Sequence, residues 1–213
     1  MAKIRHDTFA SNKKAVFLDR DGVICGNRDD HVKSWDEFQF LPHAKEAIAR
    51  LTRAGLPVVV ITNQAIINRG ITPASVVEDI HRRMIAEVKA HGGRIAQVYY
   101  CPHRPDEHCP CRKPQPGMLL QAAQDLDINL ESSYLIGDAV ADIQAAQAVG
   151  AKAYMVLTGR GKRQYLNALC QEINNFTVTL NLWRAIDDVL WLESLRTLQY
   201  EYPLTQRRGP LLN

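Results

Sequence analysis

The sequence lacks the features that mark membrane proteins, secreted proteins and nucleic-acid-binding proteins. No apolar stretch approaches the roughly 20 residues that a membrane-spanning helix needs. The N-terminal residues are polar and contain no signal-peptide core. The net charge is only +3, and basic residues cluster nowhere except at 160–163 and 207–208, so a nucleic-acid partner is not expected. We therefore expect a cytoplasmic monomer that acts on a small molecule and does not contact membranes.

Length and composition predict one α/β domain. The chain has 213 residues, 46% hydrophobic and 23% charged, which suits one globular domain with a full core. Apolar runs alternate with helical patterns, so strands are expected at 15–18, 58–61, 96–100, 134–136, 153–157 and 176–178, and helices at 42–54, 72–90, 118–126, 142–149 and 182–198. This alternation predicts a doubly wound parallel sheet, Rossmann-like, with right-handed crossovers. We expect the domain at 14–200, an N-terminal extension at 1–13 and a C-terminal tail at 201–213.

A few features receive structural assignments only. About 20 residues separate the first strand from its helix, which is too few for a separate cap domain. Thr72 is expected to cap the second helix. Trp183 and Trp191 recur at helical spacing, and both are expected in the core. Cys25 and Cys170 are expected to be packed thiols.

Two carboxylates follow the first strand directly. Asp19 and Asp21 come after an apolar run, and Gly22 permits the chain to turn there. In an open α/β sheet, ligands bind beyond the carboxyl ends of the strands. Asp19 could attack a phosphorus atom as a nucleophile, while Asp21 handles the proton of the leaving group. The alternative is a solvated acidic turn, and this pattern alone does not separate the two.

Other strand ends carry the remaining groups that phosphoryl transfer needs. Thr62 follows the second strand, Lys113 lies in the loop after the third, and Asp138 follows the fourth. A hydroxyl and a cation can bind the phosphoryl oxygens, and Asp19 with Asp138 would hold Mg²⁺ in a site of oxygen ligands. Each residue alone has an ordinary alternative, such as a helix cap, a solvated lysine or a turn. Together, in this order, they favour a phosphatase site.

A short loop has the composition of a metal site. Three cysteines and two histidines fall within eleven residues, and four of these side chains match a closed tetrahedral Zn²⁺ site formed by Cys101, His103, Cys109 and Cys111. A closed site is structural, so the zinc would fix the loop that carries Arg112 and Lys113. His108 is an alternative ligand, and reduced cysteines in a turn are the alternative to a metal.

Four motifs resemble those of the haloacid dehalogenase superfamily of phosphatases: Asp19-Arg20-Asp21-Gly22-Val23, Val60-Ile61-Thr62-Asn63-Gln64, Arg112-Lys113-Pro114, and Gly137-Asp138 with Asp142. The Cys/His loop narrows the resemblance to a zinc-bearing subgroup that contains heptose bisphosphate phosphatases and the histidinol-phosphatase domain. The similarity covers about residues 14–161. It implies that Asp19 is the nucleophile and Asp21 the general acid/base.

The same resemblance implies the ligands of the metal and of the phosphoryl group. Magnesium would be bound by the carboxylates of Asp19 and Asp138 and by the Asp21 carbonyl, with Asp142 in support. Thr62 and Lys113 would hold the phosphoryl group, and Arg112 would help to recognise the substrate. The chain departs from the pattern at Ala139 and Ala65, where these phosphatases usually have lysine and serine.

The polar residues near the expected site indicate a small phosphorylated metabolite. Substrate contacts are expected from Asn27, Arg28, Asp29, Asp30, Asn63 and Gln64. Arg112 and Lys162 could meet a second phosphate, so we expect heptose 1,7-bisphosphate to be preferred over histidinol phosphate. The alternatives are histidinol phosphate, another sugar phosphate, a nucleic-acid 3′-phosphate, or a non-catalytic binding protein.

Overall fold

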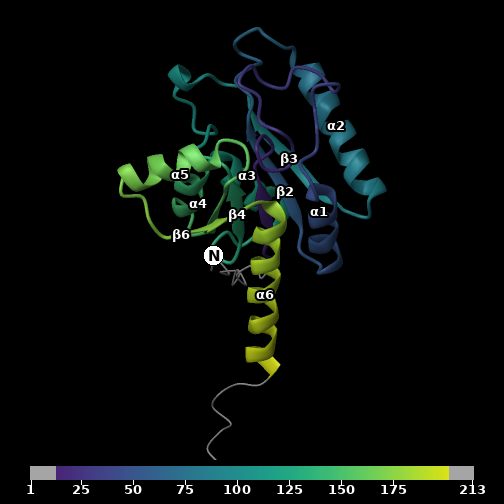
Figure 1. The fold of residues 1–213 in the computed structure, drawn as a ribbon, viewed down its shortest axis with the longest axis vertical. Helices are drawn as coiled ribbons and strands as arrows, with labels where there is room; N and C mark the ends of the chain where they lie inside the picture. Colours follow the sequence, from purple (N-terminus) through teal and green to yellow (C-terminus); the bar gives the residue numbers. More distant parts are fainter. Residues whose placement is uncertain (1–12, 202–213) are drawn as a thin grey trace, which may run out of the picture.

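A parallel six-stranded sheet forms the centre of the molecule (Figure 1). The computed structural model describes residues 13–201. Its elements, in chain order, are β1 (Val16–Leu18), α1 (Ala44–Arg53), β2 (Val58–Asn63), α2 (Ala74–Ala90), β3 (Ile95–Cys101), the short 3₁₀ helix η1 (Pro105–Glu107), α3 (Gly117–Leu126), β4 (Tyr134–Gly137), α4 (Val140–Gln147), β5 (Lys152–Val156), α5 (Gly161–Cys170), β6 (Phe176–Thr179) and α6 (Leu182–Glu201).

The strands alternate between two hydrophobic cores, as the period of two in a strand requires. Val16 and Leu18 of β1 face the core covered by α1, α2 and α6. Ala15 and Phe17 face the opposite core, which α3, α4 and α5 cover. Helices on both faces explain why the central strands are apolar throughout. The predicted doubly wound α/β fold is therefore confirmed.

The strand order places one crevice at the centre of the sheet. The order is β3-β2-β1-β4-β5-β6, and every neighbouring pair is parallel. Strands β2 and β3 lie on one side of β1, and strands β4, β5 and β6 lie on its other side. Ligands of open α/β sheets bind where the order reverses in this way. The residues after β1, β2 and β4 therefore converge on one place.

The sequence analysis missed one helix and misplaced one cap. It predicted no element at α5, because that segment is mostly polar and buries only Gly161 and Ala168. Thr72 is not the N-cap of α2: the helix begins at Ala74, and Pro73 occupies the capping position without a side-chain hydrogen bond. Helix α4 begins two residues before the predicted start. The predicted extension and tail fall almost wholly outside the described residues.

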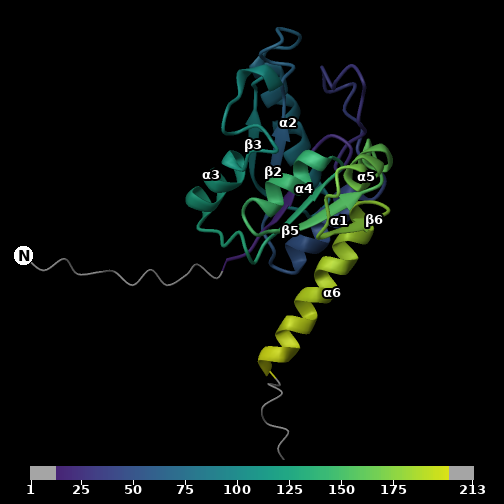
Figure 2. The ribbon, with the colours of Figure 1, turned by 90° about the vertical axis from the view of Figure 1, so that its left-hand side faces the viewer.

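Two predicted core residues are exposed. Trp183 packs against the core, but Trp191 is 61% exposed, because α6 continues beyond the edge of the sheet (Figure 2). Cys25 is buried as predicted, whereas Cys170 at the end of α5 is exposed. Within residues 13–201, no helix has both the length and the apolar character needed to cross a membrane.

Candidate active site

Asp19 and Lys113 form the centre of the candidate site. Asp19 follows β1, and its backbone N–H donates to the carbonyl oxygen of Ile136 in β4 (3.0 Å). Lys113 reaches it from the loop after β3, and its Nζ donates to Asp19 Oδ1 (2.9 Å) and to the carbonyl oxygen of Ile61 (2.8 Å). Both side chains are buried. The site thus joins a carboxylate that can act as a nucleophile to a cation that can bind phosphate.

Asp138 and Asp142 bring two more buried carboxylates to Asp19. Asp142 Oδ1 forms an ion pair with Lys113 Nζ at 2.6 Å. Its Oδ2 accepts a hydrogen bond from the backbone N–H of Ala139 (3.1 Å). One ligand oxygen of each of the three aspartates lies within 4.8 Å of the other two. The structure therefore places Asp142 inside this acidic group.

Glycines allow the backbone to close around Asp138. A Cβ atom on Gly22 would lie 2.1 Å from Asp138 Oδ2, and one on Gly159 would lie 2.4 Å from the same oxygen. Gly22 also has a φ of +87°, which L side chains rarely adopt. Thr158 Oγ1 donates to the carbonyl oxygen of Gly22 (2.7 Å), which joins the loop after β5 to the loop after β1. A side chain at either glycine would displace the Asp138 carboxylate.

The acidic group is only partly neutralised. Arg160 donates its backbone N–H to Asp138 Oδ2 (2.8 Å) and its Nη2 to Oδ1 (3.2 Å). Burial raises the pKa of Asp138, although Arg160 opposes this. Burial also raises the pKa of Asp19 to about 7, against the lowering effect of Lys113. Buried oxygen ligands with too little positive charge fit a hard divalent cation such as Mg²⁺, so these aspartates could hold that ion.

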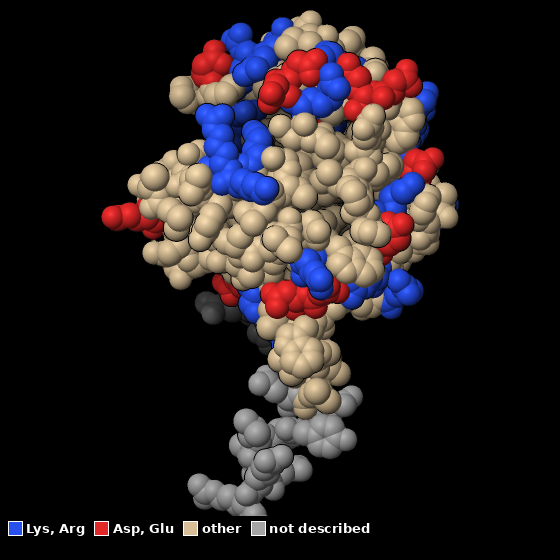
Figure 3. All heavy atoms as spheres, in the orientation of Figure 1, with Lys and Arg blue, Asp and Glu red and all other residues tan. Residues whose placement is uncertain are grey.

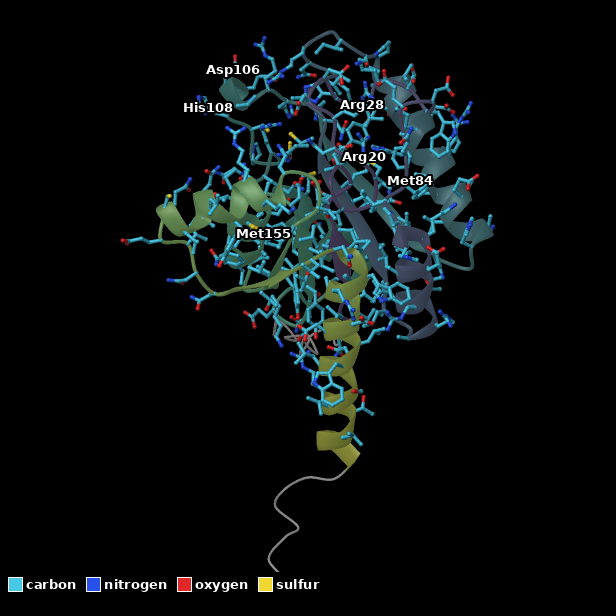
Figure 4. The ribbon with its side chains drawn as sticks, in the orientation of Figure 1. Arg20, Arg28, Met84, Asp106, His108 and Met155 are labelled. Atoms are coloured by element: carbon cyan, nitrogen blue, oxygen red, sulfur yellow. The ribbon has the colours of Figure 1, made fainter. Side chains whose placement is uncertain are left out.

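The Asp21 carboxylate contacts a buried cation, Arg20. Arg20 Nη2 lies 2.8 Å from each carboxylate oxygen of Asp21, and Gln64 Nε2 donates to Asp21 Oδ2 (3.0 Å). Burial opposes ionisation, but Arg20 holds the pKa of Asp21 below its ordinary value. The same Gln64 Nε2 donates to Thr62 Oγ1 (2.9 Å). Figure 4 shows Arg20 in the interior of the molecule, beneath the loop that carries Arg28.

The predicted zinc ligands lie together. Cys111 Sγ is 3.2 Å from Cys101 Sγ, 3.4 Å from Cys109 Sγ and 3.3 Å from His103 Nδ1. In a tetrahedral zinc site with Zn–S bonds of about 2.3 Å, the ligand atoms lie only slightly farther apart than these four atoms do. The four atoms therefore fit Zn²⁺. His108 is not in this cluster. Figure 4 shows His108 and Asp106 on the outer part of the same loop.

A polar cavity of about 200 Å³ opens over these groups. Its lining includes all four expected catalytic side chains, Asp19, Asp21, Thr62 and Lys113. It also includes Asp142 and three expected substrate contacts, Asn27, Asn63 and Arg112. Four other expected contacts, Arg28, Asp29, Asp30 and Gln64, are absent from its lining. Arg28 and Lys33 instead pair with Asp30, and Gln64 is buried.

The sequence analysis assigned no individual role to three charged or polar side chains that line the cavity: His31, Arg69 and Arg160. Arg69 Nη1 lies 3.4 Å from His31 Nε2, which joins the turn after β2 to the loop after β1. No local spacing marks these residues, because they come from three separate loops. Figure 3 shows Lys and Arg side chains gathered on the α5 side of the molecule, beneath the loop that follows β3. The expected contact Lys162 is exposed and does not line the cavity.

Comparisons with known proteins agree with this geometry. A family model described as HAD-hydrolase-like matches residues 110–184. The D-glycero-beta-D-manno-heptose-1,7-bisphosphate 7-phosphatase of Pseudomonas putida is 45% identical over 150 residues, which cover 70% of this chain and 86% of that protein. The enzyme of the same name from Neisseria meningitidis is 41% identical over 150 residues, covering 70% of this chain and 80% of that protein.

A solved structure matches nearly the whole described part of the chain. The D,D-heptose 1,7-bisphosphate phosphatase of Bordetella bronchiseptica, crystallised with magnesium and phosphate, superimposes with a TM-score of 0.79 at 36% identity. The match covers 84% of this chain and 99% of that one. By its sequence relatives and its fold, the chain belongs to the D-glycero-beta-D-manno-heptose-1,7-bisphosphate 7-phosphatase family of HAD-like hydrolases, and it is a phosphoric monoester hydrolase.

Proposed function

We propose that this enzyme removes the 7-phosphate of D-glycero-D-manno-heptose 1,7-bisphosphate through an aspartyl-phosphate intermediate and requires Mg²⁺. The observation that carries the proposal is the contact of Asp19 Oδ1 with Lys113 Nζ, at 2.9 Å, in a cavity that also contains Asp21 and Thr62. The relatives named above are phosphatases of this sugar bisphosphate. In the Bordetella bronchiseptica enzyme, the crystals contain magnesium and phosphate together.

The first step transfers the phosphoryl group to Asp19. A carboxylate oxygen of Asp19 attacks phosphorus, and the bond from phosphorus to the sugar oxygen breaks. Asp21 gives a proton to that departing oxygen, and it must carry this proton against the effect of Arg20, which lowers its pKa. Lys113 Nζ and Thr62 Oγ1 bind the equatorial oxygens, where negative charge is spread in the transition state. Asp19 and Asp138, with the Asp21 carbonyl, would hold Mg²⁺, which would supply positive charge to offset that of the phosphate.

The second step hydrolyses the acyl phosphate. Asp21, now ionised, takes a proton from water, and the water oxygen attacks phosphorus. The bond from phosphorus to Asp19 breaks, so phosphate leaves and the Asp19 carboxylate is restored. Burial raises the pKa of Asp19 to about 7, so the ionised nucleophile depends on nearby cations. Lys113 and the metal would both favour that ionised form.

Arginine side chains at the cavity favour a substrate with a second anionic group. Arg69 and Arg112 line the cavity from different loops, and neither pairs with a carboxylate in the described part of the chain. Arg112 is oriented by a hydrogen bond from its Nη1 to the carbonyl oxygen of His103 (3.1 Å). We propose that these two guanidinium groups bind the 1-phosphate. Histidinol phosphate, which brings an ammonium group, would meet like charges there.

We propose a structural role for Zn²⁺ bound by Cys101, His103, Cys109 and Cys111. Four protein ligands leave no position for water or substrate. Arg112 and Lys113 follow the last ligand directly, so the metal would hold both cations in place. A cytoplasmic location suits thiolate ligands, since reducing conditions keep them from forming disulfides. We also propose that the enzyme acts as a monomer, since the four expected catalytic side chains of one chain already meet in a single cavity.

The test is a comparison of kcat/KM on purified protein across phosphorylated metabolites. The panel contains heptose 1,7-bisphosphate, histidinol phosphate, other sugar monophosphates and a 3′-phosphorylated oligonucleotide, each with and without Mg²⁺. We expect Mg²⁺-dependent turnover with a clear preference for the heptose bisphosphate. Equal or better efficiency on histidinol phosphate would reject the proposed substrate. No turnover of any phosphate ester, even of an activated nitrophenyl ester, would reject the catalytic role.

A further inference from the structure

Arg20 is a buried cation to which the proposed mechanism gives no role. It lies between Asp19 and Asp21, and only 1% of it is exposed. Burying a guanidinium is costly unless its N–H groups are bonded and its charge is compensated. Its position next to the proposed general acid/base suggests that it acts on Asp21 itself.

The Arg20 guanidinium is held at two ends. On one side, Nε and Nη2 donate to Asp21 Oδ1 at 3.1 and 2.8 Å, and Nη2 also donates to Oδ2 at 2.8 Å. On the other side, Nη1 lies 3.1 Å from His81 Nε2. The bidentate contact with Asp21 fixes the plane of its carboxylate. His81 gives the guanidinium a second partner on the side away from Asp21.

His81 is suited to accept a hydrogen bond from Arg20. It lies in α2 and is only 5% exposed, and its ring packs against Tyr100 with 5.6 Å between the ring centres. Burial, together with the charge of Arg20, lowers the pKa of His81 to about 3. The imidazole is therefore neutral, so Nε2 accepts from Arg20 while Nδ1 carries the proton. A charged imidazole would instead repel the guanidinium.

We propose that His81 and Arg20 are positioning residues that orient the Asp21 carboxylate for proton transfer. The chain of contacts runs from α2 through the guanidinium to the end of β1, where Asp21 reaches the cavity. This proposal rests on the proposed function, in which Asp21 protonates the leaving oxygen. His81 would thus affect proton transfer from α2, although its side chain does not line the cavity.

The test uses the leaving group, because only an unactivated sugar oxygen needs a proton to depart. His81→Phe keeps an aromatic ring against Tyr100 but removes the acceptor for Arg20. His81→Gln restores a carbonyl oxygen that can accept. His91→Gln is the matched control, since His91 caps the exposed end of the same helix and its ring nitrogen Nδ1 contacts the Glu87 carbonyl oxygen within α2. Release of the leaving group is measured in single turnovers on heptose 1,7-bisphosphate and on p-nitrophenyl phosphate.

We expect His81→Phe to slow release from the sugar substrate by about tenfold or more and release of nitrophenol much less, with KM little changed. His81→Gln should recover most of the rate, and His91→Gln should match the unaltered enzyme. Should His81→Phe fail to fold, Arg20→Lys provides the same test, because a single ammonium cannot bridge Asp21 and His81.

Asp21→Asn separates this inference from the proposed function. Like His81→Phe, this variant should release the sugar leaving group more slowly than nitrophenol, and the difference between the two rates should be larger. If Asp21→Asn shows that dependence but His81→Phe slows both substrates equally, the positioning role is wrong and the proposed function stands. If Asp21→Asn itself lacks the dependence, then Asp21 is not the acid, and both the positioning role and the proton transfer assigned to Asp21 are overturned.

Discussion

Asn63 holds the backbone of Lys113 through two hydrogen bonds. Its Nδ2 donates to the carbonyl oxygen of Lys113 (3.0 Å), and its Oδ1 accepts from the backbone N–H of Lys113 (3.1 Å). The pair joins the end of β2 to the end of the Cys/His loop. Because Lys113 Nζ in turn contacts Asp19, the amide of Asn63 determines where the cation of the active site lies.

Replacing Asn63 should therefore impair catalysis without removing any expected catalytic group. Asn63→Ala leaves the buried backbone groups of Lys113 without partners, and each such loss costs roughly 1–3 kcal/mol. We expect kcat/KM to fall by about tenfold to a hundredfold. Asn68→Ala is the control, because Asn68 also contacts this loop, through Glu107, but on the exposed side. Equal kinetics for the two variants would show that the Asn63 bridge does not position Lys113.

The two aspartates after β1 should fail in different ways. Asp19→Asn cannot form an acyl phosphate, so we expect activity to fall by more than about a hundredfold while the protein stays folded. Asp21→Asn can still be phosphorylated by a substrate with a good leaving group, but it lacks the base that activates water. Mass spectrometry after a brief reaction should detect a phosphoenzyme in this variant. Substantial turnover by Asp19→Asn would contradict covalent catalysis.

Removing the two proposed metals should have separable effects. Mild chelation should stop turnover reversibly by taking Mg²⁺, while zinc stays bound in its closed thiolate site. Cys109→Ser should instead lower the melting temperature, with activity lost as a consequence. Elemental analysis, thermal melts and Mg²⁺ titration distinguish these outcomes. Folded and active protein that contains no zinc would refute the structural metal.

Arg69 should recognise the distal phosphate, whereas Lys162 should not. Arg69→Ala removes a charged donor from the cavity wall, which is worth roughly 1.5–3 kcal/mol when it bonds an anion. We expect kcat/KM on the bisphosphate to fall by tenfold or more, with little change on a monophosphorylated substrate. Lys162→Ala is the matched control, because its side chain is exposed and does not line the cavity. If kcat/KM on the bisphosphate fell more in Lys162→Ala than in Arg69→Ala, then Lys162 would contact the second phosphate, as the sequence analysis expected.

The buried imidazole should make stability depend on pH. Burial and the neighbouring Arg20 lower the pKa of His81 from 6.5 to about 3, while Asp21 acts in the opposite sense. The unfolded state therefore binds a proton more tightly than the folded state. This contribution to stability is complete above pH 6.5 and is lost as the pH falls towards 3. Urea unfolding gives the free energy of unfolding of the unaltered protein and of His81→Gln. Between pH 6.5 and about 3, this free energy should fall more steeply in the unaltered protein. Parallel curves would mean that His81 is not buried in its neutral form.

Local patterns in the sequence determined most of the fold and the reaction class. The apolar runs before Asp19, Thr62 and Asp138 predict buried parallel strands, since only such strands are apolar on both faces. Parallel strands bring their carboxyl ends to one edge, so the order of these residues already implies one site. Ligand spacing likewise predicted the Cys/His cluster, because four ligands within eleven residues can surround one ion without help from the rest of the fold.

The tertiary structure decided which residues surround the substrate cavity and which face solvent. Arg69, His31 and Arg160 meet there from separate loops, and no spacing along the chain records that meeting. Helix α5 escaped prediction because it buries too little apolar surface to show a helical period. Trp191 has the spacing of a core residue, yet it is exposed. The reason is that α6 extends beyond the edge of the sheet, so only the first turns of the helix pack against it. His81 shows no motif at all, and only the packing of α2 against β3 brings its imidazole to Arg20.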